Sequence, residues 1–219
     1  MIRMSAEGML AIWSDVAPEA EADYLHWLTR EHTAERISTA GFVSVRVFRA
    51  MDFDIRRYFI VYDLDSPSAL SGDDYVRKLN NPTPWSQRIM PTLKNFVRGG
   101  GRVTIASGAG HGGFAAAVAL EDRQTIEAET LVARLVKMDR ICSARLLKVD
   151  KAKTSIPTRE KSLRREDQSF ANLLVFDGLD AVAVRSALDS VESPASDAAM
   201  PSFVYKQVYQ LDRRQLAGV

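Results

Sequence analysis

The 219-residue chain has little of what disulfide-linked, metal-binding and nucleotide-binding proteins need. Its one cysteine, Cys142, excludes an internal disulfide and a thiolate metal cage, and is typical of a reducing compartment such as the cytoplasm. The three histidines include no pair at i,i+4 spacing, so we expect no metal site. Neither a Gly-x-Gly-x-x-Gly fingerprint nor a P-loop lysine motif is present, and we expect no cofactor. The sequence does not exclude a haem cofactor, because a single histidine suffices as an axial ligand.

Neither sign of charge prevails, and long apolar runs are missing. The 29 Lys and Arg against 28 Asp and Glu give a net charge of +1, which argues against nucleic acid or an anionic membrane as a partner. The most apolar stretch, Phe114–Leu120, is far shorter than the roughly 20 residues that span a bilayer. Residues 1–8 lack the apolar region of a secretory signal. We therefore expect a soluble, cytoplasmic, globular protein.

Glycine is concentrated in the middle of the chain. Seven of the twelve glycines fall within residues 99–113, a density typical of backbone that turns freely or joins two units. The length fits one large domain or two domains of about 100 residues. We place a boundary at about residues 108–112, which predicts two domains, residues 1–107 and residues 113–219.

Each half predicts the same order of elements. In the first half these are a strand at 9–14, a helix at 18–38, strands at 42–50 and 57–64, a helix at 68–79 and a strand near 96–106. In the second half they are a strand at 114–120, a helix at 123–138, strands at 141–149 and 170–176, a helix at 180–191 and a strand at 203–211. The order β-α-β-β-α-β is the ferredoxin-like motif.

A weak internal repeat supports a duplication. Residues 44–49 (SVRVFR) align with residues 143–148 (SARLLK), and residues 62–63 (YD) align with residues 176–177 (FD). The offsets are 143 − 44 = 99 and 176 − 62 = 114, so the second half needs an insertion.

The strands carry apolar side chains on both faces, although one ferredoxin-like unit covers only one face of its sheet with helices. We therefore predict an α+β fold in which two tandem units pack their open faces together as a pseudo-dimeric α/β barrel. The alternative is two separate sandwiches, each completed by another subunit.

Residues 151–168 interrupt the repeat. This segment carries six basic residues and few apolar ones, so it has no apolar face to bury. A solvated loop is the favoured interpretation, ahead of a phosphate-binding patch, because charge runs usually face water.

A distinctive pattern, Trp-x-x-x-Glu-His-x-x-Glu-Arg, runs from Trp27 to Arg36 and is followed by Gly41-Phe42 and Arg46. Together with an Asn-Pro-Thr-Pro-Trp-Ser run and an arginine within residues 81–88, this pattern resembles EthD-like proteins of the dimeric α/β-barrel superfamily. The resemblance covers roughly residues 9–98, and the second half matches in element order only, as a degenerate repeat. It implies the superfamily's fold. Members include cofactor-free monooxygenases, lactone isomerases, polyketide cyclases and haem proteins. Membership of the superfamily therefore restricts the class of ligand more than it restricts the type of reaction.

The aromatic and charged residues of the first half predict a small-molecule pocket. Such pockets are mostly apolar with a few orienting polar groups, although each ring alone is more often core. The predicted ligand-binding residues are Trp13, Trp27, Glu31, Arg36, Tyr58, Tyr62 and Trp85. The predicted catalytic residues are His32, Arg46 and Arg88. A neutral imidazole can act as a base near pH 7, and a pocket arginine needs an anionic partner such as a carboxylate or enolate. We expect His26 to be exposed and His111 to be solvated.

Two functions stay open at this point. The first is a cofactor-free enzyme of isomerase, cyclase or monooxygenase type that acts on a small aromatic or polyketide-like organic acid, with His32 moving a proton. The second is a non-catalytic module that binds a small hydrophobic or aromatic organic acid or serves in an assembly, with Glu31, His32 and Arg36 only in contact on a helix surface. Whether the chain is an enzyme, and whether it forms a homodimer, is not decided by the sequence.

Overall fold

The structure, a computed structural model, describes residues 6–51, 56–164, 167–191 and 203–216. Within these residues the strands are β1 (Gly8–Val16), β2 (Phe42–Ala50), β3 (Arg56–Leu64), β4 (Lys94–Gly108), β5 (Phe114–Leu120), β6 (Ile141–Val149), β7 (Asn172–Gly178) and β8 (Val204–Asp212). The helices and helical turns are η1 (Pro18–Ala20), α1 (Glu21–Trp27), η2 (Leu28–His32), α2 (Thr33–Ile37), η3 (Pro67–Ser71), α3 (Asp73–Asn80), α4 (Pro84–Ile89), η4 (Met90–Thr92), η5 (Asp122–Glu127), α5 (Ala128–Leu135), α6 (Lys151–Thr154), α7 (Arg159–Ser162), α8 (Ala181–Ser190) and α9 (Arg213–Leu216). None of these described helices is long and apolar enough to cross a membrane. Residues 1–5, on which the prediction of no secretory signal partly rests, lie outside the described residues.

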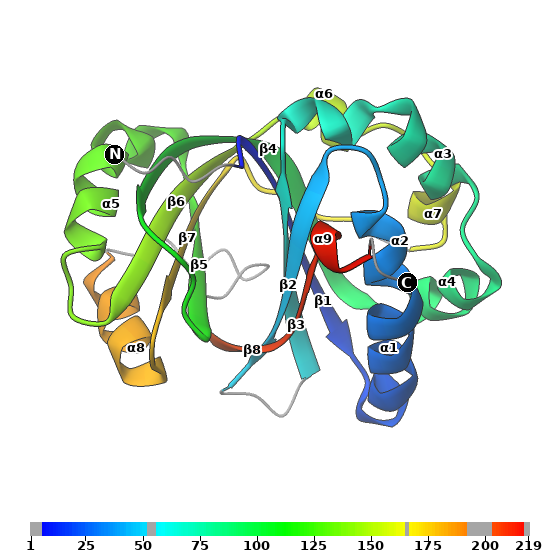
Figure 1. Cartoon of the computed structure of the whole chain (residues 1–219), viewed down its shortest axis with the longest axis horizontal. Helices are drawn as coiled ribbons and strands as arrows, with labels where there is room; N and C mark the ends of the chain where they lie inside the picture. The colour runs from blue at the N-terminus through cyan, green and yellow to red at the C-terminus, as the bar shows by residue number, and fades with distance from the viewer. Residues whose placement is uncertain (1–5, 52–55, 165–166, 192–202, 217–219) are drawn as a thin grey trace.

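The strands close into one barrel in the order β1-β3-β2-β8-β5-β7-β6-β4 (Figure 1). The first half contributes the run β4-β1-β3-β2, the second half contributes the equivalent run β8-β5-β7-β6, and the halves meet along β2–β8 and β4–β6. This confirms the prediction of tandem ferredoxin-like units that form a pseudo-dimeric α/β barrel. β4 ends at Gly108 and β5 begins at Phe114, which brackets the predicted boundary. The division into two domains stays a prediction, because the strands share one barrel.

Alternate side chains of each strand pack on opposite faces of the sheet. On β1, Leu10 and Val16 pack with the first-half helices, whereas Met9 and Trp13 lie inside the barrel among residues of both halves. A third apolar cluster lies between the second-half strands and helices α5 and α8, which stand on the opposite side of the barrel from α1 to α4 (Figure 1). The sheet is thus covered on both faces, as the apolar strands predict.

The three consecutive glycines at residues 99–101 lie inside β4 and not in a turn, which corrects the prediction of freely turning backbone there. A Cβ atom on Gly101 would stand 2.1 Å from the carbonyl oxygen of Lys148 on β6. Glycine therefore permits the close approach of β4 to β6, where the two halves meet. The turn itself comes later, at Gly108 and Gly110, whose φ angles are 86° and 73°.

The aligned residues of the internal repeat exchange ion-pair partners between the halves. Arg46 on β2 lies 3.2 Å from Asp177 on β7, and Arg145 on β6 lies 2.6 Å from Asp63 on β3. Each carboxylate also accepts a hydrogen bond from a serine of its own half, Ser44 to Asp63 at 3.0 Å and Ser143 to Asp177 at 3.2 Å. Both arginines and both aspartates are buried. Because a buried charge needs a partner, these two reciprocal pairs tie each half to the other.

The described part of residues 151–168 is only in part the solvated loop that its charge predicts. These residues belong to the connection between β6 and β7, residues 150–171, whereas β2 and β3 are joined by residues 51–55 alone. The change of offset in the repeat falls at this longer connection. It carries α6 and α7 across to the first half, where α7 contacts α3 (Figure 1). Glu160 and Arg164 of this segment are buried, and Glu160 pairs with Arg36 of the first half, whereas Lys151 and Arg159 are exposed, as predicted.

We expect Gly101→Ala to destabilise the fold, because its methyl group forces β4 away from β6. Overpacking of this kind costs about 1–3 kcal/mol. Urea unfolding measures the loss, and Gly113→Ala is the matched control, because no atom lies within 4 Å of a Cβ placed there. Equal unfolding free energies for the two variants would contradict the close-approach explanation.

Candidate functional site

A small cavity of about 30 Å³ lies between the outer face of the first-half sheet and the elements that cover it. It is large enough for a water molecule or two. Strands β1 and β3 form one wall, the helical run from α1 to α2 forms a second, and α7 of the second half forms a third. Five charged side chains line the cavity: Arg36, Arg98, Glu160, Lys161 and Arg164.

His32 lines this cavity at the end of η2, a π-helical turn between α1 and α2. Turns of this kind are rare and frequently occur at functional sites. The His32 ring stacks on the Trp27 ring with centroids 4.2 Å apart, and Trp27 Nε1 donates a hydrogen bond to Ser86 Oγ at 3.1 Å. The histidine is buried, and its Nδ1 has no hydrogen-bond partner among the described residues. This placement corrects the alternative of a histidine on a helix surface.

Burial keeps the pKa of His32 well below its ordinary value, and the nearby positive charges of Arg36 and Arg164 lower that pKa further. The ring is therefore neutral at neutral pH, with one nitrogen free to accept a proton. Beside it, burial raises the pKa of Tyr62 far above its ordinary value, so this phenol stays protonated. The cavity thus pairs a neutral acceptor with a neutral donor.

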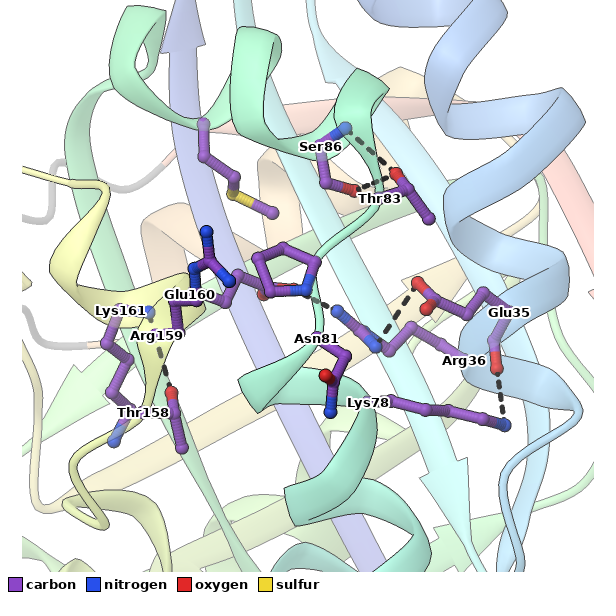
Figure 2. A network of polar contacts seen from close by, with 12 residues as sticks. Glu35, Arg36, Lys78, Asn81, Thr83, Ser86, Thr158, Arg159, Glu160 and Lys161 are labelled. Atoms are coloured by element: carbon purple, nitrogen blue, oxygen red, sulfur yellow. Dashed lines mark hydrogen bonds and ion pairs between the residues drawn. The ribbon is translucent and has the colours of Figure 1, made fainter.

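An ion pair between the two halves forms part of the cavity lining. Arg36 on α2 pairs with Glu160 on α7 and lies 3.4 Å from Glu35 (Figure 2). Arg36 and Glu160 are both buried, and the guanidinium carbon stands 5.8 Å from the centroid of the Tyr75 ring. A carboxylate on α7 is therefore required where α2 places a buried cation.

The remaining cations belong to β4 and to the second-half segment. Arg98 donates hydrogen bonds to Tyr75 Oη at 2.9 Å and to the Thr154 carbonyl oxygen at 3.1 Å. Arg164 forms two hydrogen bonds with the Asp167 carboxylate, at 2.6 and 2.7 Å. With Arg36 and Lys161 they make four cations in the lining against the single carboxylate of Glu160. This excess of positive charge favours an anionic group in or beside the cavity.

The structure brings together only some of the predicted site residues. His32, Trp27, Arg36 and Tyr62 line the cavity. Glu31 is not part of the cavity lining, and its carboxylate accepts a hydrogen bond from the Thr83 hydroxyl at 2.5 Å. Tyr58 packs on Tyr24, outside the lining, and donates to Glu21 at 2.6 Å.

Four predicted residues lie elsewhere, which corrects the predicted grouping. Trp13 is inside the barrel, stacked on Phe59 at 4.4 Å, because its parity on β1 is opposite to that of Leu10. Arg46 is also inside, on Asp177. Arg88 and Trp85 both bind Asp23 on the outer side of α1, and Arg88 is exposed. Neither predicted arginine therefore contacts the His32 cavity.

The other two histidines lie at the surface, as predicted. His26 is exposed. His111 is exposed as well, and its Nδ1 lies 3.2 Å from Asp177 Oδ2.

Sequence reasoning missed Arg98, Glu160, Lys161 and Arg164. Three of them lie in residues 151–168, and the uneven repeat offset was the available signal that this segment is an insertion. Among the described residues, no three His, Cys, Asp or Glu side chains gather as metal ligands. The cavity is also far smaller than the roughly 300–1,000 Å³ of common small-molecule sites, so a haem does not fit it without movement of the lining.

Comparison with known proteins identifies the fold alone. No family model matches the chain, and no curated protein matches it. Among solved structures, an anthrone oxidase-like protein is 12% identical with a TM-score of 0.58, and the match covers 95% of this chain and 94% of that one. A candidate monooxygenase from Fusobacterium nucleatum is 11% identical with a TM-score of 0.53, covering 95% and 96%. The chain therefore has the ferredoxin-like dimeric α/β-barrel fold of these proteins, while the EthD-like assignment stays a prediction.

We expect stability to fall below pH 6.5 because of His32. Its pKa is lower in the folded than in the unfolded protein, so the unfolded state binds an extra proton in that range. The free energy of unfolding then drops by up to about 1.4 kcal/mol per pH unit as the pH decreases. Urea titrations between pH 5 and 8 should show this contribution in the wild type and in His26→Gln, and not in His32→Phe, which keeps a ring against Trp27. An unchanged pH dependence in His32→Phe would show that His32 is not held neutral by the fold.

Proposed function

We propose that this protein binds a small aromatic or polyketide-like organic acid in the first-half cavity and acts on it as a cofactor-free enzyme of isomerase, cyclase or monooxygenase type. The proposal assigns this activity to the cytoplasm and needs no second copy of the chain, since both barrel halves are present. The anthrone oxidase-like and candidate monooxygenase structures share the fold, which supports a ligand of this size and class without naming one.

The observation that carries the proposal is the state of His32. A buried imidazole nitrogen without a hydrogen-bond partner costs about 1–3 kcal/mol, and a hydrophobic residue would avoid that cost. His32 is also kept neutral in a lining with four cations. A neutral imidazole is available to accept a proton from an acidic C–H or phenol group, and the fixed positive charges stabilise the anion that this leaves on the substrate.

The proton step follows from these residues. A neutral ring nitrogen of His32 accepts the proton, the electron pair stays on the substrate as an enolate or phenolate, and His32 becomes an imidazolium. Arg36, Arg98 and Lys161 supply positive charge for the anion, in the place predicted for Arg46 and Arg88. The distant Arg46 and Arg88 are not part of this step.

The small volume of the cavity bears on how a ligand enters it and on the alternative, non-catalytic function. A space of about 30 Å³ does not admit an aromatic acid, so we expect elements of the lining, among them α7, to move before a ligand enters. The same small volume supports the alternative function, a non-catalytic module in which the lining residues only stabilise the packing of the halves.

We expect His32→Gln to lose turnover and to retain binding. Loss of a general base lowers turnover by about 10²–10⁴-fold, whereas the cationic groups that attract the acid remain. A panel of hydroxylated aromatic acids, assayed by mass spectrometry and oxygen uptake, measures turnover, and quenching of tryptophan fluorescence measures binding.

His26→Gln is the matched control, since this histidine is exposed on the same helical run. Unchanged turnover in His32→Gln would remove His32 from the proposed role. Binding of acids by the wild type without conversion of any of them would favour the non-catalytic module.

A further inference from the structure

A surface groove of about 360 Å³ lies next to the His32 cavity. It is lined by Arg98 and by residues of the second-half segment, among them Thr154, Lys161, Arg164 and Asp167. Arg98, Lys161 and Arg164 line both the groove and the cavity. These three cations therefore form the partition between the surface and the His32 cavity.

Lys161 differs from Arg98 and Arg164 in the groups that compensate its positive charge. Arg164 pairs with Asp167, and Arg98 is held by Tyr75 and by a carbonyl oxygen. The half-buried Lys161 ammonium donates hydrogen bonds to the carbonyl oxygens of Thr154 and Ile156, the latter at 2.8 Å. It forms no ion pair with any carboxylate that the structure describes.

The charges that face Lys161 leave it short of negative charge. Arg98 on β4 and Arg164 after α7 are both positive and lower the pKa of Lys161, whereas Asp167, which is hydrogen-bonded to Arg164, opposes them in part. Glu160, the carboxylate next to Lys161 in the chain, turns to Arg36 (Figure 2). A half-buried ammonium between two guanidinium groups is stabilised by an added anion. A ligand carboxylate in the groove would supply it without displacing an existing ion pair.

We propose that the groove is the entry subsite for the carboxylate of an organic acid, and that Lys161 selects for its negative charge. This inference deepens the proposed function and rests on it. The apolar part of the acid then lies toward the partition. Movement of α7, which carries Lys161 and the carboxylate bound to it, admits the apolar part to the cavity.

The ionisation of Lys161 gives this subsite a pH signature. Burial, with the charges of Arg98 and Arg164, lowers the pKa of Lys161 to about 8. The free protein therefore loses this positive charge as the pH rises through about 8, whereas a bound carboxylate holds the proton on. Affinity for a carboxylate should consequently fall above pH 8. An uncharged analogue should show no such fall.

The test compares 2-naphthoate with the uncharged 2-naphthamide by calorimetry at pH 7 and pH 9. One pH unit above a pKa of about 8, about nine-tenths of the Lys161 side chains are neutral, so we expect about tenfold weaker naphthoate binding at pH 9. Lys161→Arg keeps its charge at both pH values and should bind naphthoate without pH dependence. Lys161→Met should bind it about tenfold more weakly at pH 7, and the exposed Lys151→Met should resemble the wild type.

Naphthoate affinity that is independent of pH in the wild type and unaltered in Lys161→Met would overturn the subsite, as would equal affinity for naphthamide or no naphthoate binding at all. If Lys161→Met does not fold, the pH profile of Lys161→Arg decides alone. Failure of the proposed function is a different result. In that case naphthoate binding depends on Lys161 as expected, but the fluorescence of Trp27 in the cavity does not respond and His32→Gln alters no turnover.

Discussion

A ferredoxin-like sheet has two apolar faces, and its own helices cover only one of them. In this protein the second face of each half is covered by the other half, so the barrel interior exists only when both are present. The reciprocal pairs Arg46–Asp177 and Arg145–Asp63 fix how the halves meet, because removal of either partner would leave a buried charge uncompensated. Closure of the barrel therefore decides which positions face the interior and which face the outer helices.

The outer layers are where the two halves differ. The second-half layer between the strands and helices α5 and α8 is built from aliphatic residues and Phe176. The first-half layer holds His32, Arg36 and Tyr62 around its cavity, and it is completed by α7, which the second half extends across the molecule. The outer layer of the first half thus carries the polar groups of the cavity, while the second half contributes the third wall. The long connection between β6 and β7, residues 150–171, distinguishes the second half from the first, where β2 and β3 are joined by residues 51–55.

The fold could be predicted from sequence because strand patterns and element order are local features, and the Arg46 and Arg145 segments align directly. The site could be predicted only in part. Val45 and Val47 face the helices, so Arg46 between them faces the barrel interior. With apolar residues at both parities, the sequence does not indicate which parity faces which layer. Glu160 could not be predicted as a site residue for another reason. Its contact with Arg36 joins residues that are 124 positions apart in the sequence, so no local pattern indicates it.

Among the described residues, buried side-chain polar atoms without a hydrogen-bond partner occur inside the barrel and in the outer layer of the first half. Inside the barrel they include atoms of Arg46 and Arg145, which occupy equivalent places in the two halves and already pair with carboxylates. In the outer layer they include His32 Nδ1 and Tyr62 Oη, and the second-half outer layer has no counterpart among the described residues. Such atoms cost about 1–3 kcal/mol each when nothing satisfies them. A cost repeated in both halves is explained by how the barrel closes. A cost present in one half only, beside a cationic lining and a π-helical turn, is not explained by barrel closure, and the proposed ligand site rests on this difference.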